Sequence, residues 1–126
     1  MNLGGIYYYY RGEFKNGLKE VEMALNMLKD NIDLPQDEKK KYMNYIYRLL
    51  GDIHLTIFEF EPAEQNYREA LEIDSNDRNS FCGLAMVQTV RGNFKEARRI
   101  YKEILVLNPD SAVAQEGLRL LDINKK

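Results

Sequence analysis

Residues of the same type recur along this chain at an interval of 34 positions, and no other feature constrains its fold as strongly. The matches involve large aromatic and small positions alike, so they preserve a packing pattern rather than a composition. They pair Phe60 with Phe94, Ala63 with Ala97, Tyr67 with Tyr101, Leu71 with Leu105 and Tyr47 with Phe81. A unit of this length cannot bury an apolar face by itself, so the period predicts an array of stacked units.

The stretch from Gly92 to Pro109 indicates that the units are helical. Its apolar residues at positions 97, 100, 101, 104, 105 and 107 recur close to the helical period and form one apolar face. Asn93 and Glu96 predict a capping box at the start of this helix. Pro109 predicts its end, because the residue before a proline is disfavoured in the helical conformation.

The N-terminal third of the chain departs from the even period. We expect a short first helix over residues 2–11, a turn at Gly12 and a second helix over residues 15–29. The first two units then lie 46 residues apart instead of 34, so 12 residues, approximately 32–43, are inserted between them. We expect the helices beside this insertion to extend as a long hairpin, with Asp37 as the N-cap of the second one.

The pattern within each unit resembles the tetratricopeptide repeat family, whose repeat is 34 residues long. Its order is an aromatic residue, a Leu-Gly or Leu-Ala pair, a turn, a small alanine, a tyrosine and a closing proline. The residues that carry the resemblance are Tyr47, Leu50, Gly51, Ala63 and Tyr67 in one unit, and Phe81, Leu84, Ala85, Gly92, Ala97, Tyr101 and Pro109 in the next.

The resemblance implies an all-α fold. This fold is a right-handed superhelical solenoid of antiparallel helix pairs, with about three repeats and a C-terminal capping helix. Residues 1–126 then form a single domain, and Asp110 and Ser111 cap its last helix. The expected divisions are a partial repeat 1–31, the insertion 32–43, repeats 44–77 and 78–111, and the capping helix 112–123.

The charge balance and the spread of apolar residues exclude several classes of function. The chain has a formal net charge of −2 and a sequence pI near 5.5, whereas binders of nucleic acids or anionic membranes are usually basic. No apolar run reaches membrane-spanning length, and the tyrosine-rich N-terminus does not have the basic start of a signal peptide. We therefore expect a cytoplasmic protein that neither binds nucleic acid nor inserts into a membrane.

Residues that could carry catalysis or bind a metal are scarce. His54 is the single histidine, and it falls at the helix-packing position that Gln88 occupies one unit later, so we interpret it as structural. Cys82 has no base near it in the sequence and is a poor nucleophile candidate. The segment 74–79 lacks the glycine and the glutamate of a calcium loop. The sequence predicts no catalytic residue, metal site or cofactor, and hence no enzyme.

In tetratricopeptide repeat proteins, the first helices of successive repeats line a concave groove that binds partner peptides. The corresponding positions here are Ile6, Tyr9, Tyr10, Tyr45, Arg48, Asp52, Leu55, Met86 and Thr89. One subgroup of the family holds a C-terminal carboxylate there with Lys, Asn and Arg side chains. We do not expect that clamp, because Ile6, Cys82 and Met86 occupy sites where it needs basic or amide groups.

The expected groove is apolar and aromatic, with one pair of charges. Arg48 is its single cation, and Asp52, one helical turn later, is expected to pair with it. Tyrosine and methionine are favoured at recognition surfaces. We therefore expect a non-catalytic adaptor or scaffold that binds an amphipathic helix or an extended apolar peptide across Ile6, Tyr9, Leu55 and Met86. The alternative is a scaffold that associates with itself through its uncapped first repeat.

Overall fold

The computed structural model describes the backbone over residues 3–31 and 33–123, and the side chains over residues 12–31 and 33–123. Over this part of the chain every regular element is a helix, so the predicted all-α fold is confirmed. The helices are α1 (Leu3–Asp30), α2 (Gln36–Thr56), α3 (Phe60–Ile73), α4 (Arg78–Val90), α5 (Phe94–Leu107) and α6 (Ala112–Ile123).

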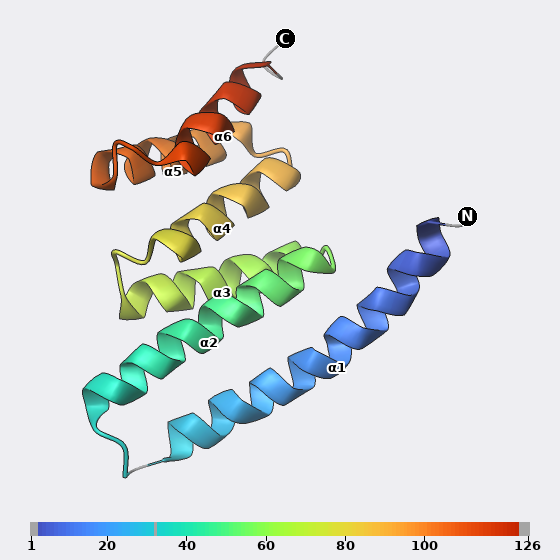
Figure 1. The fold of residues 1–126 in the computed structure, drawn as a ribbon, viewed down its shortest axis with the longest axis vertical. Helices are drawn as coiled ribbons and strands as arrows, with labels where there is room; N and C mark the ends of the chain where they lie inside the picture. Colours follow the sequence, from blue (N-terminus) through green and yellow to red (C-terminus); the bar gives the residue numbers. More distant parts are fainter. Residues whose placement is uncertain (1–2, 32, 124–126) are drawn as a thin grey trace.

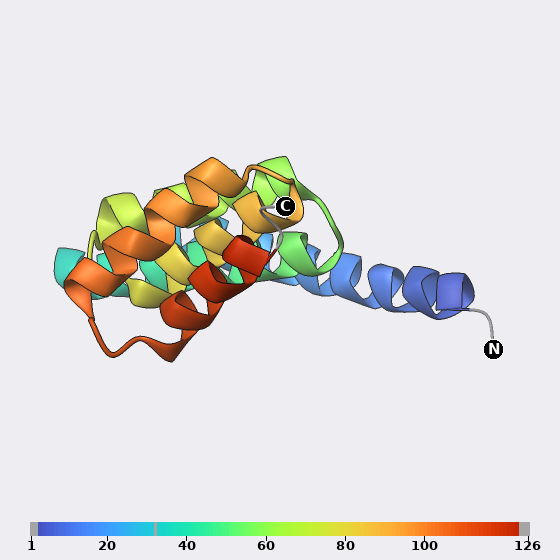
Figure 2. The same cartoon turned by 90° about the horizontal axis from the view of Figure 1, so that it is seen from above.

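The helices stack in chain order, and each one packs against the next (Figure 1). Helices α2, α4 and α6 lie on one side of the stack and α3 and α5 on the other, as the view from above in Figure 2 shows. Contacts also join α2 to α4 and α4 to α6, so the helices of the first side form a continuous face. The N-terminal part of α1 projects beyond the stack.

The predicted turn at Gly12 is wrong. Helix α1 runs without interruption through Gly12 and Gly17, so the two short helices expected there are one helix of 28 residues. A glycine inside a helix costs only about 1 kcal/mol relative to alanine, and it permits a turn without imposing one. The segment 7–15 contains no proline and no Ser, Thr, Asp or Asn that could end one helix and cap another.

The expected long hairpin between α1 and α2 is present. These helices have 28 and 21 residues, whereas the others have between 12 and 14. The cap of α2 differs from the prediction, since Pro35 rather than Asp37 precedes the helix and Asp37 lies in its first turn. An acidic residue is favourable there because the helix N-terminus carries a partial positive charge.

Two tyrosines set the spacing between successive helix pairs. Tyr67 has no exposed surface. A Cβ atom at Gly83 would lie 2.3 Å from its Cζ atom, and one at Gly51 would lie 2.7 Å from its Cε1 atom. Tyr101 fits against Gly117 in the same way, at 2.4 Å. Each glycine therefore leaves the space that a neighbouring ring fills, and the 34-residue period corresponds to this recurring contact.

The turns between paired helices also recur. The backbone N–H of Glu59 donates to the His54 carbonyl, and that of Asn93 donates to the Gln88 carbonyl, both at 2.8 Å. In each turn the two side chains also form a hydrogen bond of 2.9 Å. One joins His54 Nδ1 and Glu59 Oε1, and the other runs from Asn93 Nδ2 to Gln88 Oε1. His54 is buried, and its contact at the turn agrees with the structural role expected for it.

The capping box predicted for α5 does not form. The side chain of Asn93 donates to Gln88 instead of accepting from the first turn, and the Glu96 carboxylate pairs with Arg99. The competing partners come from the preceding helix and from the next turn of α5. Of the two residues predicted to cap α6, Ser111 is confirmed, because its Oγ atom accepts from the Ala114 N–H at 3.2 Å.

Candidate functional site

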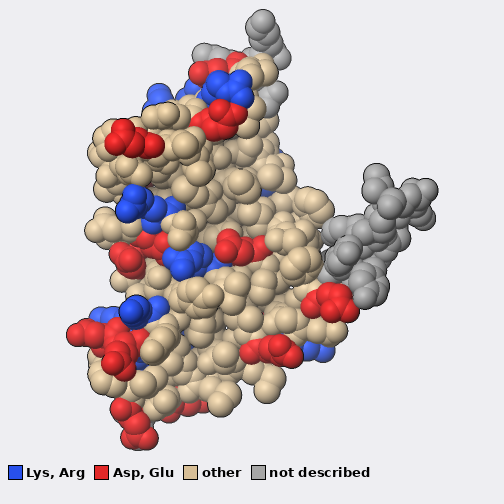
Figure 3. All heavy atoms as spheres, in the orientation of Figure 1, with Lys and Arg blue, Asp and Glu red and all other residues tan. Residues whose placement is uncertain are grey.

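A cavity of about 300 Å³ opens between α2 and α4 on the face that α6 continues. Four of the predicted groove residues contribute to its lining. The lining consists of Arg48, Asp52, Leu55, Tyr67, Asn79, Cys82, Gly83 and Met86. Figure 3 shows this side of the molecule, where broad uncharged areas separate the charged side chains. We refer to the surface over α2, α4 and α6 as the groove.

Arg48 does not pair with Asp52, so that prediction is wrong. Its guanidinium lies 3.2 Å from the Asp77 carboxylate and 5.4 Å from the centre of the Tyr45 ring. The side chain is 23% exposed and that of Asp77 is 3% exposed. The positive charge of Arg48 is therefore compensated by a buried anion and partly covered by an aromatic ring, which is itself exposed.

Asp77 connects the start of α4 to α2. Its carboxylate accepts from the Ser80 N–H at 3.2 Å, from Ser80 Oγ at 2.7 Å and from Asn44 Nδ2 at 2.9 Å, besides its contact with Arg48. Burial acts to raise the pKa of Asp77, but these hydrogen bonds and the guanidinium outweigh it and hold the pKa below its usual value. The group is thus a fixed anion that caps α4 and orients Arg48.

Asp52 lies on the groove with its carboxylate exposed to solvent. Its Oδ1 atom accepts a short hydrogen bond from the hydroxyl of Tyr67. Burial, and next the contact with Asp52, raise the pKa of Tyr67 far above its usual value, so the phenol keeps its proton and remains a donor. A buried ring thereby holds an exposed carboxylate in one direction.

Apolar side chains make up the rest of the groove. Leu55 is half-buried against the core, while Met86 and Val90 are each 49% exposed. Thr89, another predicted groove residue, is partly exposed, and its hydroxyl donates to the Ala85 carbonyl at 2.9 Å. Burial raises the pKa of the Cys82 thiol, with a smaller contribution from Asp77, so Cys82 is a poor nucleophile.

The groove continues onto α6, which the sequence interpretation treated only as a cap. Val113, Leu120 and Ile123 are between 46% and 57% exposed. They lie 34 residues after Asn79, Met86 and Thr89, so the same period that located the α4 positions would have located these. The predicted groove residues Ile6, Tyr9 and Tyr10 lie outside the residues whose side chains the structure describes.

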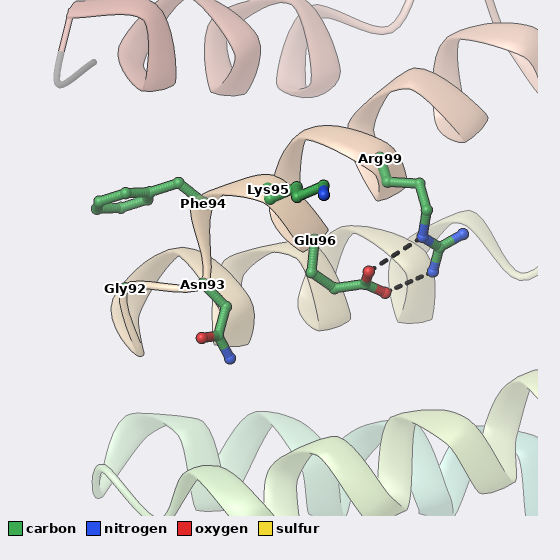
Figure 4. Close-up of a pocket in the computed structure, with 6 residues that line it drawn as sticks. All are labelled: Gly92, Asn93, Phe94, Lys95, Glu96 and Arg99. Atoms are coloured by element: carbon green, nitrogen blue, oxygen red, sulfur yellow. Dashed lines mark hydrogen bonds and ion pairs between the residues drawn. The ribbon is translucent and has the colours of Figure 1, made fainter. Parts of the chain in front are cut away.

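A second cavity, of about 640 Å³, lies at the turn between α4 and α5 (Figure 4). Two of its charged groups pair with each other, because Arg99 forms hydrogen bonds with Glu96, and Arg99 also contacts Glu103 one turn later on α5. Phe94 points away from this pair. The amide of Asn93 is held by Gln88. We assign this cavity to the packing of the turn.

The described part of the chain has neither a metal-binding cluster nor a membrane-spanning helix. No three His, Cys, Asp or Glu side chains come together there as they would around a metal ion. None of its helices combines the length and the apolar character needed to cross a membrane.

The amino-acid sequence was compared with those of known proteins and protein families. No protein-family model matches the chain. Cellulose synthase operon protein C of Komagataeibacter xylinus is 38% identical over 65 residues, which are 52% of this chain but 5% of that protein. The chain therefore spans only a small fraction of this curated relative.

Solved structures match over nearly the whole chain. The C-terminal TPR-containing domain of a putative FK506-binding protein of Plasmodium falciparum has a TM-score of 0.74 at 18% identity, covering 97% of this chain and 83% of that one. The second TPR domain of human RPAP3, solved with the HSP70 peptide SGPTIEEVD, has a TM-score of 0.63 at 18% identity and covers 92% of each chain. The predicted resemblance is thus confirmed, and the chain has the tetratricopeptide repeat fold.

Proposed function

We propose that this chain is a protein–protein interaction module that binds a peptide or helix of its partner in the groove. The observation that carries the proposal is the cavity between α2 and α4, which includes Arg48, Asp52, Leu55 and Met86 in its lining. The RPAP3 domain, which shares the fold, was solved with a bound peptide. A module of this kind, used as an adaptor or scaffold, needs no catalytic group.

The side chains of the groove suit recognition better than chemistry. Met86 is exposed, and an unbranched thioether side chain adapts to differently shaped apolar partners. The two residues that could have suggested catalysis are engaged otherwise. His54 is buried and bonded to Glu59, and the Cys82 thiol is held protonated by burial.

The proposal is tested by selecting peptides from a random phage-displayed library on the immobilised full chain. Affinities of synthetic copies are then measured by fluorescence anisotropy for the wild type, Met86→Glu and Val106→Glu. Val106 is 81% exposed on α5 and lies outside the groove, so its variant controls for the added charge. We expect Met86→Glu to weaken binding at least about tenfold, because binding would desolvate the new carboxylate, and Val106→Glu to bind like the wild type.

Two results would contradict the proposal. One is the failure of repeated selections to enrich any peptide that binds the chain in solution. The other is equal affinity of the wild type and Met86→Glu for every selected peptide, at unchanged helicity by circular dichroism. The second result would place binding on a surface other than the groove.

Self-association through α1 is the second candidate function, and the exposure of one helix face favours it. Met23 and Met27 are 63% and 72% exposed. Ala24 is also exposed, whereas its counterpart Ala70 in α3, 46 residues later, has no exposed surface. The described part of α1 packs on α2 alone, while α3 packs on both α2 and α4. Sedimentation equilibrium over a wide concentration range tests this function, and a monomer at every concentration excludes it.

A further inference from the structure

The charges in the cavity between α2 and α4 do not balance. Arg48 is directed to Asp77, which is buried, and its guanidinium lies beside the Tyr45 ring. This pair is neutral as a whole. Asp52 is the other charged residue in the lining of the cavity, and its described partner is the uncharged hydroxyl of Tyr67. The cavity between α2 and α4 therefore has one uncompensated negative charge.

The Asp52 carboxylate is positioned to receive a ligand. A carboxylate can accept about four hydrogen bonds, and the hydrogen bond from Tyr67 uses one of these positions. The phenol also fixes the direction of the group, so little conformational freedom remains to be lost on binding. Leu55 and Met86 line the same cavity, and their apolar surface lowers the local dielectric and strengthens an ion pair formed there.

We infer that the groove selects a peptide that places a lysine or arginine side chain on Asp52, with apolar residues following along α4 and α6. The inference rests on the proposed function and adds the chemistry of the partner. The apolar positions beyond Asp52 are Met86 and Val90 on α4 and Leu120 and Ile123 on α6, all of them exposed by 46% or more. An aliphatic stem of lysine or arginine can lie along Leu55 while its head reaches the carboxylate.

The same charge excludes a different class of peptide. The HSP70 peptide bound by the RPAP3 domain, SGPTIEEVD, has three acidic side chains and no basic one. In the groove of this chain such a peptide would meet the Asp52 carboxylate, and the guanidinium of Arg48 is already engaged by Asp77. Like charges in one interface disfavour the wrong partner. We expect this chain not to bind SGPTIEEVD.

The experiment uses the peptides selected on the full chain, the peptide SGPTIEEVD, and copies of the selected peptides in which each basic residue is replaced by glutamine. Affinities are measured for the wild type, Asp52→Asn, Asp52→Glu and Glu72→Gln. Asp52→Asn keeps an oxygen that can accept from Tyr67 and removes only the charge. Asp52→Glu keeps the charge, and Glu72→Gln removes an exposed charge on α3, outside the groove.

We expect the selected peptides to share a lysine or arginine beside apolar residues. Asp52→Asn should weaken their binding about three- to tenfold, as for a partly exposed charge-assisted contact, while Asp52→Glu and Glu72→Gln bind within about twofold of the wild type. On the wild type, the glutamine peptides should bind more weakly than the selected peptides by the same factor. On Asp52→Asn, the glutamine peptides and the selected peptides should bind equally well. Tight binding of SGPTIEEVD to the wild type would overturn the inference.

The inference and the proposed function fail in different ways. Peptides that need Met86 but bind Asp52→Asn as tightly as the wild type would overturn the inference and leave the groove as the binding site. Peptides that bind without regard to Met86 would overturn the proposed function, and the inference with it. Thermal unfolding of each variant, followed by circular dichroism, shows that a loss of binding does not arise from a loss of fold.

Discussion

Replacing Gly83 with alanine tests whether the Tyr67 ring sets the spacing of α2 and α4. The added Cβ atom would lie 2.3 Å from Cζ and 2.4 Å from Cε1 of Tyr67, well inside the separation of about 3.5–4.0 Å that carbon atoms prefer. The ring has no exposed surface and has Gly51 on another side, where a Cβ would lie 2.7 Å away. It cannot make room for the methyl group without moving a helix.

Three contributions decide the magnitude of the effect. Overpacking a filled interior costs about 1–3 kcal/mol. A displaced hydroxyl also loses part of its hydrogen bond to Asp52, which contributes about 1 kcal/mol at this partly exposed position. Alanine in a helix interior gains about 1 kcal/mol over glycine. The balance is a loss of about 2 kcal/mol in the free energy of unfolding.

Urea unfolding followed by far-ultraviolet circular dichroism measures this loss. Gly17→Ala is the matched control, because it makes the same change inside a helix where a Cβ atom would have no other group within 4 Å. We expect this variant to gain about 0.5–1 kcal/mol, so the two alanines shift the midpoint in opposite directions. If Gly83→Ala is as stable as the wild type, the Tyr67 ring does not fill the space beside Gly83 as described.

Two further predictions concern the capping of α4 and the turn after it. The pKa of Asp77 is lower in the folded than in the unfolded state, so its contribution to stability is present above its unfolded pKa and is lost as the pH falls through its folded pKa. Urea midpoints measured between about pH 5 and pH 2 should therefore fall more steeply for the wild type than for Asp77→Asn. Parallel curves for the two proteins would contradict this. Gly92 has a φ of 85° with open space around it, so Gly92→Ala should cost about 1–2 kcal/mol through backbone strain alone, and an unchanged urea midpoint would contradict that reason.

The 34-residue period predicted the fold because it reflects a contact that recurs. Tyr67 and Tyr101 each fill the space beside a glycine of the following helix, Gly83 and Gly117 respectively. A large residue can be buried at each repeat only if the small one recurs with it, so both positions keep the same period. The structural role of His54 follows from the same regularity, because His54 and Gln88 occupy equivalent positions before their turns.

The partner of Arg48 was not predicted because it lies far away in the chain. The rule that residues four apart in a helix interact led to Asp52 as the partner of Arg48. The actual partner, Asp77, lies 29 residues away and is the N-cap of α4. Only the packing of α4 on α2 brings these two charges together. The Asp77 carboxylate also accepts hydrogen bonds from Asn44 and Ser80. No local sequence pattern around Arg48 therefore indicates the Arg48–Asp77 ion pair.

Gly12 was misinterpreted for a related reason. A turn was predicted at Gly12 because Gly12 is equivalent to Gly92. The turn at Gly92, however, depends on two features: a positive φ at Gly92, and the hydrogen bond from the Asn93 N–H to the Gln88 carbonyl. Phe58 shows the converse, since it occupies the position equivalent to Gly92 and takes a φ of 62° without being a glycine. The surrounding contacts, rather than the glycine, impose the turn.

The comparison of equivalent positions also separates residues that serve the fold from those available for binding. Asp52 is followed at intervals of 34 by Met86 and Leu120. Tyr101, the equivalent of Tyr67, is buried against Gly117 just as Tyr67 is buried against Gly83. The position equivalent to Asp52 beside Tyr101 is Met86, which has no carboxylate. The slot therefore forms without a carboxylate. Since the packing of the repeat does not need Asp52, the charge at this position is free to serve recognition, and Asp52→Asn should alter peptide selectivity far more than stability.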